Sequence, residues 1–114
     1  MSKKTSGKPE LNLQIIRDKL GVKRDMDKIE GKLLIIASQK GKIAYVKFLI
    51  ENGADVHAMN DEALRWASEN GHFEVVRFLV KNGANVHAMN DEALRWASEN
   101  GHLEVASFLK DNFK

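Results

Sequence analysis

Apolar residues recur at helical spacing along the second half of the chain. In residues 73–82 they fall three, four or seven positions apart, and residues at these spacings share a helix face. The pattern predicts one helix over 73–82 and, before it, a shorter helix over 62–70 that Gly71 ends in a left-handed conformation. Asn60 or Asp61 is expected to cap the start of that first helix with a side-chain oxygen.

This helix pair belongs to a thirty-residue unit that occurs twice in tandem. Residues 54–83 and 84–113 are identical at 23 of 30 positions. Residues 24–53 form a diverged third unit at the same period, because an alanine–serine pair, a glycine and an apolar run fall in register with the later copies. A unit this short cannot bury its own apolar face and becomes stable by stacking on a neighbour. The sequence therefore predicts an all-α stack of three helix pairs.

The differences between the two close copies concentrate on one helical stripe. That stripe changes from large apolar residues to smaller or charged ones, at Phe73, Val76 and Val80 against Leu103, Ala106 and Lys110. The opposite stripe is copied unchanged. We interpret the changed stripe as the face toward the next unit, so that the last copy ends the stack as a solvent-facing cap.

The segment ahead of the first unit has a different pattern. Residues 9–23 carry apolar side chains at helical spacing between Pro9, which fits a first helical position, and Gly21. They predict an N-terminal capping helix over the open end of the stack. Residues 1–8 hold three lysines among Ser, Thr and Gly and predict a flexible basic tail. Nuclear import or nucleic-acid contact is the alternative use of these lysines.

Charge and composition narrow the class of protein. Residues 1–50 hold 12 Lys/Arg against 5 Asp/Glu, and residues 51–114 hold 6 against 11, so a basic end and an acidic end are expected. The absence of cysteine excludes disulfides and thiolate chemistry. The longest apolar run, 33–37, is too short for a membrane span. The N-terminus lacks the apolar core of a signal peptide, so an intracellular, cytoplasmic protein is predicted.

The stretch from residue 70 to residue 86 matches a known pattern. Its sequence, NGHFEVVRFLVKNGANV, resembles the ankyrin repeat, whose familiar pattern includes GHxxVVxxLLxxGAxVN, and the resemblance covers about residues 24–113. It implies an ankyrin-repeat solenoid of stacked helix-turn-helix units. The units depart from the family in opening the first helix with EALR instead of TPLH, and in having thirty residues instead of thirty-three. The missing residues fall in the finger between units, so the fingers should be short.

Thirty-residue units of this wording resemble those abundant in giant DNA viruses and some intracellular microbes, which would place the protein in a host cytoplasm. Ankyrin arrays generally bind other proteins through a concave face formed by the fingers and the first helices. The resemblance implies a binding role for the positions that match this face, namely Gln39, Lys40, Asn52, Met59, Glu69, Asn70, Asn82, Met89, Glu99 and Asn100. His57 and His87 are further finger positions.

Some of these positions also have a purely structural interpretation. Glu69 and Glu99 fit solvated partners of the arginines four residues earlier. Trp66 and Trp96 repeat at the thirty-residue period and predict a ladder of rings along one side of the stack. Packing between units is one interpretation of this ladder. An aromatic anchor for a partner is the other, with Trp96 favoured because no unit follows it.

The four histidines repeat in register, as His57 with His87 and His72 with His102. One stacking step of packed helices is about 10 Å, so two such imidazoles cannot share a zinc ion bound at about 2 Å. We therefore predict no metal and no cofactor. The sequence also lacks a nucleophile paired with a base, a phosphate-binding glycine loop and paired carboxylates. No catalytic residue and no enzymatic activity are predicted.

The sequence thus predicts a non-catalytic module that binds another protein through the concave ankyrin face and masks, inhibits or bridges it. Two alternatives stay open. One is nucleic-acid association through the basic N-terminal end, which would depend steeply on salt. The other is an engineered repeat scaffold without a natural partner. A monomer is expected, and the exposed end stripe would also allow an end-to-end dimer.

Overall fold

The computed structural model describes residues 11–21 and 29–113. Within these ranges the chain forms seven α-helices and no strand. The helices are α1 (Leu13–Leu20), α2 (Ile29–Gln39), α3 (Ile43–Glu51), α4 (Ala58–Glu69), α5 (Phe73–Lys81), α6 (Ala88–Glu99) and α7 (Leu103–Asp111). The predicted all-α solenoid is confirmed. The expected tail over 1–8 lies outside the described residues.

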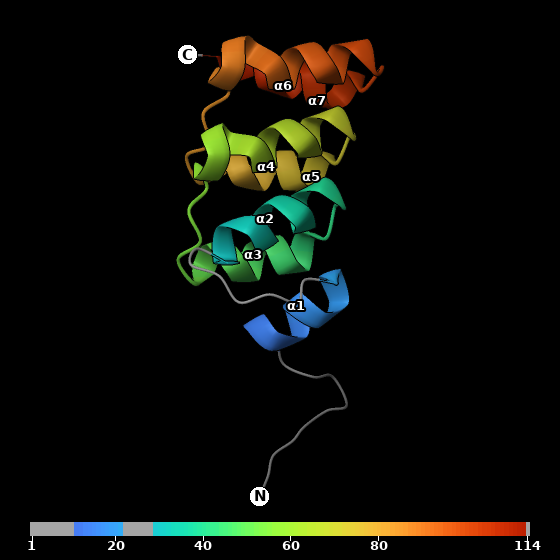
Figure 1. Ribbon diagram of the computed structural model, residues 1–114. Coiled ribbons are helices and arrows are strands. Elements are labelled where there is room, and N and C mark those ends of the chain that lie inside the picture. The colour runs from blue at the N-terminus through green and yellow to red at the C-terminus, as the bar shows by residue number, and fades with distance from the viewer. Residues whose placement is uncertain (1–10, 22–28, 114) are drawn as a thin grey trace, which may run out of the picture.

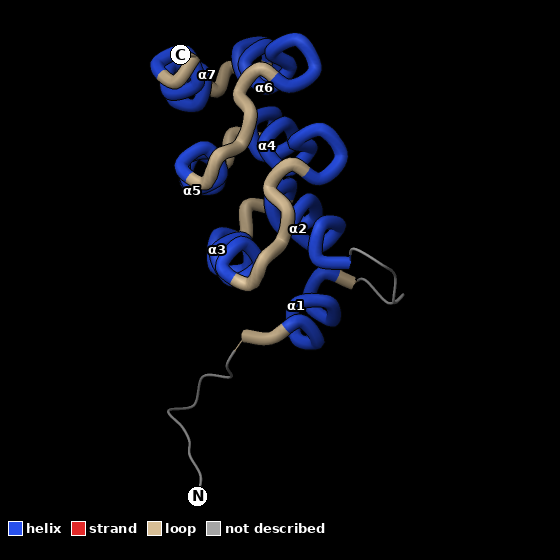
Figure 2. The backbone as a smooth tube through the Cα atoms, turned by 90° about the vertical axis from the view of Figure 1, so that its left-hand side faces the viewer, coloured by secondary structure: helices blue, strands red, loops and turns tan. Residues whose placement is uncertain are grey.

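The helices stack as three antiparallel pairs, α2 with α3, α4 with α5 and α6 with α7, with α1 below the first pair (Figure 1). Seen from the side, the first helices of the pairs form one column and the second helices form another, and the connections between pairs cross from one column to the other on the side facing the viewer (Figure 2). The stack is 50 Å long and 30 × 23 Å across. Only six residues, 82–87, join α5 to α6, so the fingers are short, as predicted.

The core runs continuously through the three pairs, because each unit buries its apolar residues against the next. It includes one fully buried leucine from each second helix, Leu49, Leu79 and Leu109. The first helices contribute buried alanines, Ala63 and Ala67 in α4 and Ala93 and Ala97 in α6. Such small side chains let neighbouring helices approach closely.

Helix α1 begins later than the sequence suggested. Asn12 has extended backbone angles and its Oδ1 accepts the Ile15 N–H at 2.9 Å, so it caps a helix whose first residue is Leu13. Pro9, the expected first helical position, lies outside the described residues. Ile16 is fully buried and α1 packs against α2. The expected end of this helix at Gly21 is seen, with φ of 80°.

In the first two units the helix-ending glycine has a second role besides its backbone conformation. Gly71 has φ of 74°, and a Cβ there would lie 2.5 Å from Nδ1 of His102 in the next unit. Gly41 meets His72 in the same way at 2.6 Å. The imidazole of one unit therefore sits directly on the glycine of the unit before it, which explains the repeated Gly-His pair.

The stripe of α7 that was predicted to face solvent is partly buried. Leu103 is 74% exposed and Lys110 is exposed, as expected for the open end. Ala106 is 7% exposed and thus buried, so the prediction that the whole stripe faces solvent is wrong at its middle position. The equivalent Val76 is fully buried. Phe73, at the start of the stripe, packs edge-on against Phe108 of the last unit, with ring centroids 5.6 Å apart.

Candidate protein-binding face

The first helix of each later unit starts with a left-handed turn. Met59, Asn60 and Asp61 have φ of 56°, 59° and 58°, and the equivalent residues of the last unit have nearly the same angles. Left-handed backbone costs roughly 1–2 kcal/mol for each residue other than glycine, so three in succession need compensation. The right-handed part of α4 begins after this turn, at Glu62.

An arginine one turn later supplies part of this compensation. Arg65 Nε donates to the Asn60 carbonyl at 3.1 Å, and its Nη2 donates to the Met59 carbonyl at 3.0 Å. Arg95 makes the same two bonds in the last unit, at 3.0 and 3.2 Å. The arginine therefore satisfies two carbonyls that the turn directs away from the helix.

Asp61 does not cap its own helix, so the N-cap prediction is wrong. Its Oδ2 accepts the backbone N–H of Asn85 in the next finger at 2.8 Å, and its carboxylate accepts from His57 Nδ1 at 3.0 Å. Asp61 is buried. This carboxylate therefore joins two consecutive fingers, a role that the left-handed turn makes available by directing it toward the next unit.

The interpretation of Glu69 as the solvated partner of an arginine four residues earlier is also wrong. The free nitrogen of Arg65, Nη1, donates to Glu92 Oε1 of the next unit at 2.8 Å. Both side chains of this ion pair are only 13% exposed. Glu69 is half-buried, and its Oε1 is buried with no hydrogen-bond partner among the described residues. The arginine thus connects units instead of neighbouring turns.

The tryptophans form the expected ladder. The Trp66 and Trp96 ring centroids lie 6.1 Å apart with the ring planes at 58°, and both residues are half-buried. Trp66 Nε1 donates to Glu62 Oε2 at 2.7 Å. The geometry shows packing between units for Trp66, while Trp96 has no ring stacked beyond it among the described residues.

The residues at the far end of the first helices also link units. The side-chain amide of Asn70 donates to the Gln39 carbonyl at 3.2 Å, and His72 Nε2 donates to the same carbonyl at 3.0 Å. Asn100 donates to the Glu69 carbonyl at 3.4 Å and to its own helix at 2.9 Å. Lys40 beside them is exposed. These amides are thus already occupied within the stack, whereas the Gln39, Lys40 and Glu99 side chains are exposed to solvent.

The finger edge carries two exposed methionine side chains. Met59 is 62% exposed and Met89 is 51% exposed. Asn52 and Asn82 lie behind them and use their side-chain amides to bond the last turn of their own helices, at 2.8 and 2.9 Å. Asn52 and Met59 both line a hollow of about 660 Å³ between the start of α2 and the chain entering α4.

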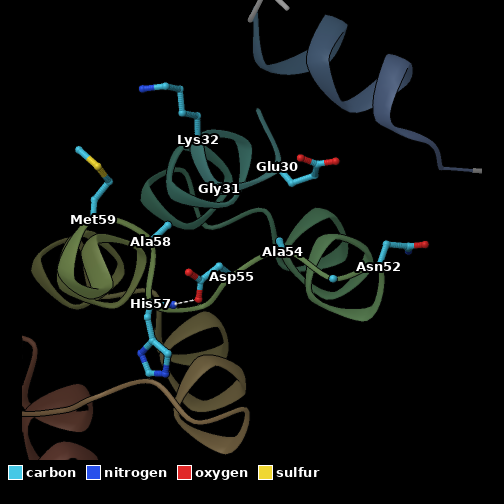
Figure 3. Close-up of a pocket in the computed structure, with 10 residues that line it drawn as sticks. Glu30, Gly31, Lys32, Asn52, Ala54, Asp55, His57, Ala58 and Met59 are labelled. Atoms are coloured by element: carbon cyan, nitrogen blue, oxygen red, sulfur yellow. Dashed lines mark hydrogen bonds between the residues drawn. The ribbon is translucent and has the colours of Figure 1, made fainter. Parts of the chain in front are cut away.

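Figure 3 shows this hollow with Met59 and Lys32 pointing outward, away from the helices. At its floor the Asp55 carboxylate accepts the His57 backbone N–H at 2.9 Å, which holds the chain entering α4 in a tight turn. The hollow is open and is lined by side chains of both charges, Glu30 and Lys32.

The predicted residues therefore form two rows instead of one patch. Asn52, Asn82 and the two methionines lie along the finger edge, while the Gln39–Lys40, Glu69–Asn70 and Glu99–Asn100 pairs lie at the opposite ends of the first helices. At 1.5 Å per residue, the right-handed helix between the rows is about 12 Å long. The tryptophans lie between the rows.

His87 in the last finger has a partner on each ring nitrogen. Nδ1 bonds to Asp91 Oδ1 at 2.6 Å, and Nε2 bonds to the Phe113 carbonyl at 3.0 Å. Because both partners are acceptors, both bonds form only when the ring is the imidazolium. The hydrogen bond to Asp91 and then the one to Phe113 raise the pKa of His87 above its usual 6.5. The described residues contain no cluster of three or more side chains that could hold a metal ion.

Comparison with known families accounts for this architecture. The family model for ankyrin repeats (3 copies) matches the chain over residues 7–90 and again over 34–114. The chain belongs to the ankyrin-repeat family. No curated protein matches the sequence. Ankyrin repeats are generally protein-interaction modules and are typically non-catalytic. No helix in the described part of the chain is long and apolar enough to cross a membrane.

Two features of this ankyrin stack could not be found by matching residues to the family. These are the bonds from Arg65 to the turn and to Glu92, and the bond between Asp61 and the next finger. The exact repetition of both residues at Arg95 and Asp91 was the one signal in the sequence. Phe113 was also missed, because its backbone carbonyl makes the contact with His87.

Proposed function

We propose that this ankyrin stack is a non-catalytic module that binds a partner protein mainly through its finger edge, with Met59 and Met89 as anchors. The observation that supports this is the exposure of two large apolar side chains, at 62% and 51%, on backbone held in place by hydrogen bonds. Methionine is unbranched and polarisable, so it adapts to apolar partner surfaces.

The rigidity of the anchors strengthens the proposal. A side chain on a mobile loop would lose conformational entropy on binding, whereas an anchor on an ordered turn loses less. One unit separates Met59 from Met89, which is about 10 Å for packed helices. Both methionines are therefore available to a single partner element lying along the stack. Asn52, Asn82 and the hollow beside Met59 would supply polar contacts at the rim.

The opposite row of residues completes the proposed concave face. Gln39, Lys40 and Glu99 have exposed side chains and would make rim contacts, Glu69 in the same row is half-buried, and Trp96 lies half-buried between the two rows. Asn70 and Asn100 use their amides inside the stack, so we expect them to shape this face more than to bind. By occupying a partner surface without altering it, such a module would mask, inhibit or bridge the partner.

Affinity capture with matched variants tests the proposal. The immobilised chain is compared with Met59→Ser/Met89→Ser, which removes both anchors, and with Arg77→Ser, which changes an exposed residue of α5 to the serine already present at the same position of the last unit. We expect a partner that the parent and Arg77→Ser retain and the methionine variant loses, with circular dichroism unchanged. Equal retention by all three chains would contradict a finger-edge anchor.

The nucleic-acid alternative gains no support from the structure. Of the basic residues that motivated it, those in 1–10 and 22–28 lie outside the described residues. Within the described part, Arg17, Lys19 and Lys32 remain as the basic residues of that end. Retention of DNA or RNA on a filter at low salt would revive it.

A further inference from the structure

Two identical stretches of sequence have different surroundings in this stack. Residues 56–72 and 86–102 are the same, residue for residue. Any difference in exposure between equivalent side chains therefore reports what the following unit covers. The side chain of Asp61 is 6% exposed and that of Asp91 is 41% exposed. Ser68 is fully buried, whereas Ser98 is exposed.

The same comparison shows that the guanidinium of Arg95 is held in place but has no carboxylate partner among the described residues. Its guanidinium is held by the Met89 and Asn90 carbonyls, as that of Arg65 is held one unit earlier. Arg65 then directs its remaining nitrogen, Nη1, to the Glu92 carboxylate. No carboxylate meets Arg95 within the described chain, and Arg95 is exposed. Arg95 is thus an ordered cation whose Nη1 has no hydrogen-bond partner among the described residues.

Because α4 and α6 have the same sequence, the features of α6 that contact α4 indicate what could bind to α6. Glu92 and Trp96 lie four residues apart and so share one face of α6. From that face Glu92 reaches Arg65 and Trp96 packs on Trp66. The occupant of α4 is therefore a helix with a carboxylate and, one turn later, a large ring, packed along its length.

The second helix of the last unit has changed in a way that α6 has not. At the end of the stack α7 carries Lys110 where α5 carries Val80, and Leu103 where α5 carries Phe73. These changes suit contact with water at the α7 half of the end. The α6 half keeps every residue of α4. At the exposed face of the last unit, α7 thus carries residues suited to water, whereas α6 keeps the residues with which α4 contacts the following unit.

We propose that the exposed end of α6 is a docking surface for an α-helix of a partner protein that presents an acidic side chain to Arg95 and, four residues later, an aromatic ring to Trp96. Charge complementarity supports this occupant, because an ordered and unpaired guanidinium selects a carboxylate. The inference rests on the proposed protein-binding function and adds a partner chemistry to it. The helix would lie on α6 as α6 lies on α4, and would exclude water from the new ion pair to the same degree.

A helical peptide probe tests this docking surface. The peptide has the sequence of residues 86–102 and is held helical by a crosslink on the face opposite Glu92 and Trp96. It is titrated into the full chain, with calorimetry for affinity and the Arg95 Nε–H and Trp96 Nε1–H resonances for location. Its matched control carries Glu92→Gln, and the full chain is also used as Arg95→Gln, with Arg77→Ser as the unrelated variant.

We expect saturable binding that shifts both resonances. Either Glu92→Gln in the peptide or Arg95→Gln in the chain should weaken it about tenfold or more, because each leaves a charge unpaired at a covered contact. The two changes together should weaken binding little beyond either one, since they remove the same ion pair. Arg77→Ser should bind as the parent does. Absence of saturable binding, or equal affinity for the two peptides, would overturn the docking surface.

Two further results separate this inference from its alternatives. If sedimentation shows that the parent chain self-associates and the Arg95→Gln chain does not, the occupant is a second copy and the partner helix is overturned. If the peptide fails to bind while capture still depends on the methionines, the docking surface is wrong and the finger-edge function stands. If the peptide binds as expected and capture ignores the methionines, the finger-edge anchor fails instead.

Discussion

Replacing Arg65 with methionine tests whether the short unit depends on this side chain. Arg65→Met keeps the aliphatic length and removes the guanidinium, which bonds to two carbonyls of the left-handed turn and to Glu92 of the next unit. Arg95→Met is the matched control. It removes the same two carbonyl bonds from the same local sequence, but no carboxylate of a following unit pairs with Arg95 among the described residues.

The expected magnitudes follow from these contacts. At an exposed position, water replaces much of what the carbonyls lose, so Arg95→Met should cost about 1 kcal/mol of unfolding free energy. Arg65→Met loses the same bonds and also leaves the Glu92 carboxylate, 13% exposed, without its cation. Breaking a buried pair costs about 3–5 kcal/mol, and some remaining exposure reduces this. We therefore expect Arg65→Met to cost roughly 3–4 kcal/mol, a large share of the 5–15 kcal/mol typical of a domain.

Urea denaturation followed by far-ultraviolet circular dichroism measures both variants. Helical signal reports all the units, and a shift in midpoint without a change in slope reports stability alone. Glu92→Gln and the double variant Arg65→Met/Glu92→Gln complete a cycle that isolates the pair. The double variant should be no less stable than Arg65→Met, because both side chains of the former ion pair are then neutral and no unpaired charge is left at the interface.

Equal losses for Arg65→Met and Arg95→Met would refute this reasoning. That result would mean that the guanidinium acts only within its own turn and that the contact with Glu92 adds nothing to the stack. A strictly additive cycle would lead to the same conclusion. The docking proposal for Arg95 would also weaken, because it takes the Arg65 pair as its template.

Two further predictions concern the glycines and the last finger. Gly71→Ala should lower the melting temperature clearly more than Gly101→Ala. Both glycines have left-handed φ, but a Cβ at Gly71 would lie 2.5 Å from an imidazole, whereas a Cβ at Gly101 would face open space. Equal losses would contradict a steric role for Gly71. The raised pKa of His87 means that its imidazolium stabilises the last unit fully below about pH 6.5, the unfolded value, and that this contribution is lost as the pH rises through the folded pKa. Hydrogen exchange of α7 should therefore be slower relative to His87→Gln at acid pH and equal to it at alkaline pH, and a parallel pH dependence in the two chains would exclude the contribution.

Much of the architecture could be predicted from local pattern. The thirty-residue period, the glycine helix ends and the apolar stripe of α5 depend on spacing along the chain, so Gly71 and Val76 were assigned correctly. The start of α4 could not be predicted in this way. Asn60 and Asp61 have ordinary capping side chains, yet they lie in a left-handed turn whose stability depends on Arg65 and on Asn85 in the next unit. Such partners have no local signature.

The candidate binding face was likewise predictable only where it depends on positions along the chain and not on contacts between units. The sequence placed Met59 and Met89 among the binding positions as finger residues, and the structure shows that both side chains are exposed. It treated Asn70 and Asn100 as binding residues, whereas their amides reach back to carbonyls 31 residues earlier. Whether an amide is free to bind depends on which backbone groups the stack brings near it.

By itself the sequence determined the repeat, the helices and the direction of stacking, because periodic apolar spacing specifies which faces must be buried. The tertiary structure alone decided which of two identical residues is covered. Asp61 and Asp91, or Arg65 and Arg95, have the same neighbours along the chain for several residues in each direction. One of each pair is buried against the next unit and the other faces solvent. Burial and ion pairing depend on what lies across the interface, and identical sequence carries no information about that.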